Sequence, residues 1–262
     1  MLNLSELTDK VRALAIEAGD FIREERKKFH REAIEKKHAH DYVSYVDKES
    51  EKKIVTRLKE LLPEAGFIAE EGSGTLNDEQ YCWLGDPLDG TTNFIHDNAP
   101  YCVSIALRSK KELLLGVVYE ICRNECFWTY KGAPSYLNGN EIHVSAISNL
   151  DDSFIALGFP YATEEYKPMA NHLVNTLYGN VAGLRLMGAA AVELCYIAAG
   201  RFEARIEAFI GPWDIAAGTI ILQNAGGMIT DFKGGDSYSS GSQVLASNGR
   251  IHRDLLNIID NL

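Results

Sequence analysis

The chain has 262 residues, of which 46% are hydrophobic, so it can bury a large core in one domain or in two closely packed halves. Its formal net charge of −11 argues against nucleic acid as the main partner, because an acidic surface repels a phosphate backbone. Bound divalent cations would reverse this field locally, so the acidity is compatible with a metal-dependent enzyme that acts on an anionic substrate.

The N-terminal sequence, the apolar runs and the cysteines together predict a soluble, cytoplasmic protein. Residues 1–6 lack a basic start and an apolar core, so we expect no signal peptide, and no apolar stretch approaches the length of a membrane span. The five cysteines are an odd number scattered among apolar segments, which indicates reduced, buried thiols. Cys122 and Cys126 have no second cysteine pair or nearby histidines, so zinc is not expected.

The first half of the chain predicts two helices and then a series of strands. Apolar residues at three- and four-residue steps indicate an amphipathic helix over 4–28 and a second helix over 47–62, which Pro63 ends. The polar stretch 30–43 has no clean period, and we expect a loop or a loosely held hairpin there. The predicted strands are 67–69, 81–85, 101–108, 112–121 and 125–130, the last three being antiparallel.

The second half begins near residue 150 and mixes strands with helices. The predicted strands are 153–157, 201–206, 228–232 and 243–246, and the predicted helices are 164–178, 188–199, 212–224 and one from 251 onward. The irregular alternation, with hairpins in the first half, favours an α/β (α+β mixed) fold with mixed sheets between helix layers over a doubly wound sheet. We expect a single unit over 1–262, made of halves 1–149 and 150–262.

The strongest chemical signal is the ten-residue segment 86–95, Asp-Pro-Leu-Asp-Gly-Thr-Thr-Asn-Phe-Ile, which follows a predicted buried strand. Asp86 and Asp89 can face one point in space, and the following Gly-Thr-Thr offers N–H groups and a hydroxyl to an anion. Carboxylates bind a hard cation, and the cation together with a helix N-terminus can bind phosphate. The alternative is an acidic turn that closes a strand, because Asp, Pro and Gly are common turn residues.

Further acidic residues end predicted strands or begin predicted helices: Asp47, Glu70, Glu71 and Asp214. Each has a structural explanation of its own, since a carboxylate is favoured in a first helical turn and two glutamates before a Gly turn can simply be solvated. Element ends are also where α/β proteins assemble their sites, and converging carboxylates repel one another unless a cation is present.

Three motifs occur together and in a particular order. They are Ile-Ala-Glu-Glu at 68–71, Trp-Leu-Gly-Asp-Pro-Leu-Asp-Gly-Thr-Thr-Asn-Phe at 83–94, and Gly-Pro-Trp-Asp-Ile-Ala-Ala-Gly at 211–218, the last followed by Asn-Ala-Gly-Gly at 224–227. In order and spacing they resemble the inositol monophosphatase family of Mg²⁺-dependent, lithium-sensitive phosphatases. Matches run from the first helix to Ala-Ser-Asn at 246–248, so the resemblance covers essentially the whole chain.

The resemblance implies a five-layer αβαβα sandwich and a metal site. The implied metal ligands are Glu70, Asp86, the main-chain carbonyl of Leu88, Asp89 and Asp214. Oxygen-only ligands of this kind suit Mg²⁺. The implied catalytic residues are Thr91, Asp47 and Glu70, with Thr91 and Asp47 orienting the attacking water and helping to deprotonate it.

The resemblance also implies a substrate site, in which substrate selection rests on the second half of the chain. Its residues would be Asp89, Gly90, Thr91 and Asp214 around the phosphate, and Arg185, Gly188, Ala189, Ala190 and Glu207 around the alcohol group. Glu207 would bond a sugar-alcohol hydroxyl, whereas Arg185 has a surface ion pair as its alternative. Ala189 replaces the Ser or Thr of many relatives, and Gly85 stands where a bulky apolar residue is usual. Lys36 or Lys37 could match a loop lysine of the family, but this stretch does not align.

We therefore expect Mg²⁺-dependent hydrolysis of inositol monophosphate to inositol and phosphate by direct attack of water. The alternatives are a phosphatase for 3′-phosphoadenosine 5′-phosphate or fructose 1,6-bisphosphate, and a regulatory protein of this fold that binds transcription machinery. Thr-Asn-Phe at 92–94 favours the inositol branch, because relatives that act on nucleotides typically have Lys-Glu-Phe there, and residues 158–161 resemble bacterial inositol phosphatases. The expected partners are a small phosphate monoester and a second copy of the chain, with no membrane.

Overall fold

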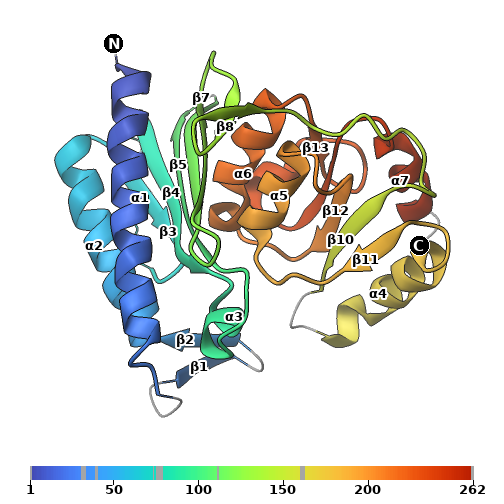
Figure 1. Ribbon diagram of the computed structural model, residues 1–262, viewed down its shortest axis with the longest axis horizontal. Coiled ribbons are helices and arrows are strands. Elements are labelled where there is room, and N and C mark those ends of the chain that lie inside the picture. The colour runs from blue at the N-terminus through green and yellow to red at the C-terminus, as the bar shows by residue number, and fades with distance from the viewer. Residues whose placement is uncertain are drawn as a thin grey trace.

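Five alternating layers of helices and sheets build the molecule (Figure 1). The computed structural model describes residues 2–30, 34–38, 41–72, 74, 79–110, 112–159 and 163–260. The outer helices α1 (Leu4–Arg26) and α2 (Tyr45–Leu61) cover a seven-stranded sheet, and α5 (Ala190–Ala198) and α6 (Pro212–Asn224) separate it from a five-stranded sheet. Helices α4 (Thr163–Leu177) and α7 (His252–Ile259) form the last layer. This is the expected αβαβα sandwich.

The seven-stranded sheet is antiparallel except at one edge. Its order is β3 (Gly66–Ala69), β4 (Tyr81–Asp89), β5 (Cys102–Ser109), β6 (Leu113–Glu120), β7 (Glu125–Tyr130), β8 (Ser135–Leu137) and β9 (Asn140–Ile142). Only the β3–β4 pair is parallel. Helices cover both faces, so β5 and β6 are almost continuously apolar rather than alternating.

The five-stranded sheet is mixed, as the sequence predicted. Its order is β11 (Gly183–Arg185), β10 (Phe154–Gly158), β12 (Ala204–Ala208), β14 (Gln243–Ser247) and β13 (Met228–Thr230). The strand β10 is parallel to both β11 and β12, whereas β14 is antiparallel to both of its neighbours. The first sheet takes its strands from residues before 150 and this one from residues after 150.

Small residues allow the central helices to pack closely. A Cβ atom at Gly218 of α6 would lie 2.6 Å from the Cβ of Leu194 on α5. A Cβ at Gly116 of β6 would lie 2.7 Å from the carbonyl oxygen of Ala217. Glycine at both positions therefore lets α6 approach α5 on one side and the first sheet on the other, which brings the start of α6 to the edge of that sheet.

The predicted long helices are confirmed to within a few residues, and the polar stretch is a two-stranded hairpin of β1 (Ile34–His38) and β2 (Asp41–Ser44). The sequence missed α3 (Thr91–Ile95), β8, β9, β11 and the 3-10 helix η2 (Ser237–Ser240), which are too short to show a period. The strand expected over 81–85 continues to Asp89, so Gly85 lies within β4, paired with Ile105. The cysteines are free, but the expectation that all of them are buried is wrong: Cys82 is half-buried, and Cys122 is exposed because it lies in the turn between β6 and β7. No described helix is long and apolar enough to cross a membrane.

Candidate functional site

Three carboxylates converge at one edge of the seven-stranded sheet. Glu70 directly follows β3 and Asp86 follows Gly85 in β4, and these strands are parallel with Ala69 opposite Gly85. The two acidic side chains therefore come from the same edge, and α6 brings Asp214 to it in its first turn. One carboxylate oxygen of each lies within 4.8 Å of the others.

A bulge in β4 places two aspartates in the same cleft. Residues three apart in a regular strand face opposite sides of the sheet, so Asp86 and Asp89 would diverge in an unbroken strand. The pairing of β4 with β5 shifts register between them, at Pro87 and Leu88. Pro87 has no N–H to lose from the ladder, and the N–H of Leu88 donates to Oδ1 of Asp86 at 2.8 Å. Both aspartates consequently line one cavity.

Asp89 is held by the first turn of α5. The N–H groups of Ala190 and Ala191 donate to its two carboxylate oxygens at 3.1 and 2.8 Å. Burial raises the pKa of Asp89 to about 7, although these amides oppose the shift. Asp89 thus lines the cleft beside the three clustered carboxylates and joins the first sheet to the central helix layer.

The acidic cluster is electrostatically strained without a cation. Burial, followed by the charges of Glu70, Asp89 and Asp214, raises the pKa of Asp86 well above its ordinary value. Burial, followed by the charges of Asp89 and Glu70, raises the pKa of Asp214 in the same way. A hard divalent cation would relieve this repulsion, and a site made of oxygen donors fits Mg²⁺. The residues present therefore suit the metal that the resemblance implied.

Thr91 and Asp47 are joined beside this cluster. The Thr91 hydroxyl lies 2.8 Å from Oδ1 of Asp47 and 3.0 Å from the carbonyl oxygen of Leu88. The other carboxylate oxygen of Asp47 accepts from the N–H and the hydroxyl of Ser44, which caps α2. Burial raises the pKa of Asp47, although the hydrogen bonds from Ser44 and Thr91 oppose the shift. The capping box therefore fixes the carboxylate that Thr91 contacts.

The acidic cluster and the Thr91 side chain border a cavity of about 680 Å³. Its walls come from both sheets, and they include the following residues predicted for the substrate site: Asp89, Gly90, Thr91, Gly188, Ala189, Ala190, Glu207 and Asp214. Leu88 also lines it. The structure does not bring Arg185 to this cavity. Its exposed guanidinium lies 4.5 Å from the ring centre of Phe154 instead.

Sequence reasoning missed two charged residues in the cleft, Glu193 and Arg205. Both line the cavity, and their side chains are 1% and 2% exposed. The available signal was a charge within an apolar stretch, since Glu193 stands between Val192 and Leu194. The contact between α5 and β12, which pairs the two charges, could not be read from that pattern.

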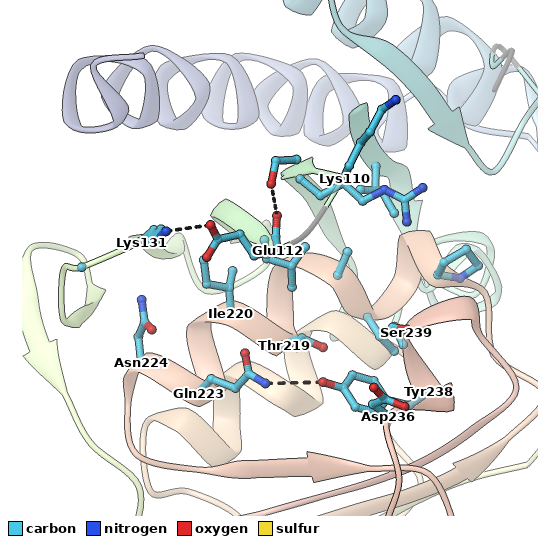
Figure 2. Close-up of a pocket in the computed structure, with 18 residues that line it drawn as sticks. Lys110, Glu112, Lys131, Thr219, Ile220, Gln223, Asn224, Asp236, Tyr238 and Ser239 are labelled. Atoms are coloured by element: carbon cyan, nitrogen blue, oxygen red, sulfur yellow. Dashed lines mark hydrogen bonds and ion pairs between the residues drawn. The ribbon is translucent and has the colours of Figure 1, made fainter. Parts of the chain in front are cut away.

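A second cavity, of about 510 Å³, lies against another set of α6 residues (Figure 2). Thr219, Ile220 and Gln223 form part of its wall, and Gln223 donates to the hydroxyl of Tyr238 at 3.4 Å. Lys131 and Glu112 form an ion pair of 2.6 Å at its rim. None of the three clustered carboxylates lines it, so the acidic cleft is the candidate for metal-dependent chemistry.

The layered α/β sandwich and its acidic cleft define a class of proteins that place oxygen donors for a hard cation in a cleft lined by both sheets and by the helices between them. The chain belongs to the inositol monophosphatase family, whose model matches residues 3–261. It is 39% identical over 225 residues to the Nus factor SuhB of Pasteurella multocida, covering 85% of this chain and 84% of that protein.

Solved structures of the family superimpose closely. The extragenic suppressor protein suhB from Bartonella henselae gives a TM-score of 0.90 at 32% identity, over 96% of this chain and 97% of that one. The inositol monophosphatase from Anabaena (Nostoc) sp. PCC 7120 gives a TM-score of 0.89 at 30% identity, over 100% of this chain and 98% of that one. The relatives thus carry names of two kinds, enzymatic and regulatory.

Proposed function

We propose that the protein is a Mg²⁺-dependent phosphatase that hydrolyses inositol monophosphate to inositol and phosphate. The observation that carries the proposal is the meeting, in one cleft, of the carboxylates Glu70, Asp86 and Asp214 with the hydrogen-bonded pair Thr91–Asp47. Membership of the family supports the reaction class.

The metal would be held by oxygen atoms from both halves of the chain. The proposed ligands are Glu70, Asp86, the main-chain carbonyl of Leu88, Asp89 and Asp214. When bound, Mg²⁺ supplies charge neutralisation at the phosphate and a lower pKa for the attacking water. In this proposal, residues 1–149 supply most of the metal ligands and residues 150–262 select the alcohol group of the substrate.

The chain's own contribution to the proton transfer comes from Thr91 and Asp47. The Thr91 hydroxyl donates to Asp47, so its oxygen is free to accept a hydrogen bond from the water that attacks phosphorus. As the water attacks, its proton passes to the oxygen of Thr91 and the Thr91 proton passes to Asp47. Burial raises the pKa of Asp47, which makes it a better proton acceptor than an exposed aspartate. Glu70 completes the proposed catalytic group.

The alcohol side of the substrate would contact Glu207 and the turn before α5. Glu207 is a hydrogen-bond acceptor in the cavity, suited to hydroxyl groups, and Gly188, Ala189 and Ala190 line the same cavity. The N–H groups of Gly90 and Thr91 would bind the phosphate. Arg185 is not one of the proposed substrate contacts, because its guanidinium lies over the ring of Phe154, outside the cavity.

The name Nus factor, given to a relative 39% identical to this chain, favours a second candidate function. In that role the fold would bind transcription machinery, and the acidity of the chain would favour protein over nucleic acid as the partner. A cytoplasmic location and a homodimer remain proposals in either case.

A phosphate-release assay with Mg²⁺ tests the function. Its substrates are inositol 1-phosphate, 3′-phosphoadenosine 5′-phosphate and fructose 1,6-bisphosphate. We expect the highest kcat/KM for inositol 1-phosphate. A higher kcat/KM for either of the other two esters would identify that ester as the substrate instead. Absence of all hydrolysis, with binding to purified transcription complexes, would support the regulatory candidate instead.

A further inference from the structure

A buried guanidinium connects two carboxylates in the wall of the cleft. Arg205 lies on β12 two residues before Glu207, so both side chains point to the same face of the sheet. Its Nε atom donates to Oε2 of Glu193 at 2.5 Å, and its Nη2 atom contacts Oε2 of Glu207. Nη1 has no hydrogen-bond partner among the described residues.

Glu193 extends this connection to the segment before α5. Its Oε1 atom accepts from the N–H groups of Met187 and Gly188 at 3.2 and 3.1 Å. Both of these residues line the cleft. Glu193 and Arg205 together therefore join the turn before α5 to Glu207 on β12. One guanidinium contacts two carboxylates, and its contact with Glu207 involves only Oε2, so Oε1 of Glu207 keeps the capacity to accept from hydroxyls.

The backbone of a neighbouring strand confines Glu207 from another side. Gly158 of β10 is paired with Glu207 in the sheet, and a Cβ atom at Gly158 would overlap the Glu207 carboxylate. The carboxylate is thus held between Arg205 and the bare backbone of Gly158. It has little freedom to adopt another orientation.

We propose that Arg205 is a positioning residue that sets substrate selectivity by fixing the carboxylate of Glu207. This inference rests on the proposed function, because selectivity is defined for that reaction. Well-packed apolar residues stabilise a core as well as or better than a buried ion pair. The buried ion pair of Glu193 and Arg205 is therefore explained by the orientation that it imposes on Glu207 rather than by stability. That orientation requires both the charge and the forked geometry of arginine.

Arg205→Lys tests this proposal, because lysine keeps the charge but lacks the fork that reaches both carboxylates. The measurement is the ratio of kcat/KM for inositol 1-phosphate to kcat/KM for 4-nitrophenyl phosphate, an ester without neighbouring hydroxyls. We expect the ratio to fall about tenfold, the range for loss of a charge-assisted hydrogen bond. The double variant Arg205→Lys/Glu207→Gln should show a ratio no lower than Glu207→Gln alone, because Arg205 acts through Glu207. An unchanged ratio, or losses that simply add in the double variant, would overturn the proposal.

Arg201→Lys is the matched control. Arg201 makes a two-pronged ion pair with Glu125 at 2.7 and 2.6 Å and does not line the cleft, so its substitution should leave the ratio unchanged. If Arg205→Lys does not fold, Glu193→Gln/Arg205→Gln removes the two most buried charges together, so neither of them is left as an unpaired ion. It should lower the ratio in the same direction, and an unchanged ratio would count against the proposal. Wild-type protein inactive on both esters would overturn the proposed function and this inference with it, whereas an active wild type with an unchanged ratio overturns this inference alone.

Discussion

The hydroxyl of Thr91 lies 2.8 Å from Oδ1 of Asp47, although the two residues are 44 positions apart in the chain. Asp47 is fixed by the capping box at the start of α2, and Thr91 begins the short helix α3 directly after β4. A helix of the outer layer and a turn at the edge of the first sheet therefore supply the two halves of the proposed proton path.

Thr91→Ala should lower kcat about 100- to 10,000-fold and change KM little. The hydroxyl acts on the attacking water, where proton transfer contributes in the transition state, while the main-chain N–H that would bind phosphate is retained. Steady-state kinetics on inositol 1-phosphate measures both constants. Thr56→Ala is the control, because that hydroxyl donates to the carbonyl of Lys52 on the surface of α2. A raised KM with normal kcat would make Thr91 a binding residue.

Asp89→Asn should abolish Mg²⁺-dependent turnover without unfolding the protein. An amide oxygen binds a hard cation weakly, and the amide can still accept from one of the two α5 N–H groups that Asp89 now serves. Circular dichroism and phosphate release on the same sample check both parts. Asp9→Asn, on the exposed face of α1, should keep full activity. Near-normal turnover by a folded Asp89→Asn protein would refute the metal assignment.

Mg²⁺ should raise the Tm more at pH 8 than at pH 6. Burial raises the pKa of Asp89 from 3.8 to about 7, and burial with neighbouring charges raises the pKa of Asp86 and Asp214. A carboxylate with a raised pKa stabilises the metal-free fold below its ordinary pKa, and that stability is lost as the pH rises through the folded value. Mg²⁺ binds the ionised form, so protons compete at pH 6 and weaken binding about tenfold for one group with a pKa near 7.

Thermal unfolding with and without MgCl₂ at the two pH values measures this difference. KCl at equal ionic strength controls for screening. An equal Tm gain at pH 6 and pH 8 would show that the cation does not bind at the buried aspartates.

Glu207→Gln should reduce kcat/KM for inositol 1-phosphate about ten- to a hundredfold more than for 4-nitrophenyl phosphate. A charge-assisted hydrogen bond contributes about 1.5–3 kcal/mol, and the aryl ester offers no sugar hydroxyls to the carboxylate. The two substrates are assayed with the same enzyme sample, so losses of folded protein cancel in the ratio. Glu203→Gln, also a buried glutamate but outside the cleft, is the control. Equal losses on both esters would remove Glu207 from the alcohol site.

Most of the architecture could be predicted because it depends on local patterns. The apolar period of α1 and the continuous apolar runs of β5 and β6 marked their elements, and the mixed sheets followed from hairpins in the first half and alternation in the second. Segments of three to five residues, such as β11 and α3, were missed because they are shorter than one informative period. Lys36 and Lys37, which could match a loop lysine of the family, lie in β1. Their side chains fall outside the part of the chain that the structure describes.

The sequence by itself determined the acidic motif, since Asp86, Asp89 and Thr91 lie within six residues and any compact folding of that turn keeps them near one another. The tertiary structure alone decided which distant charges meet. Because of the bulge at Pro87, Asp86 and Asp89 line the same cleft. The packing of α5 on β12 pairs Glu193 with Arg205. Such contacts depend on how layers pack and on side-chain direction, which no local period of the sequence encodes.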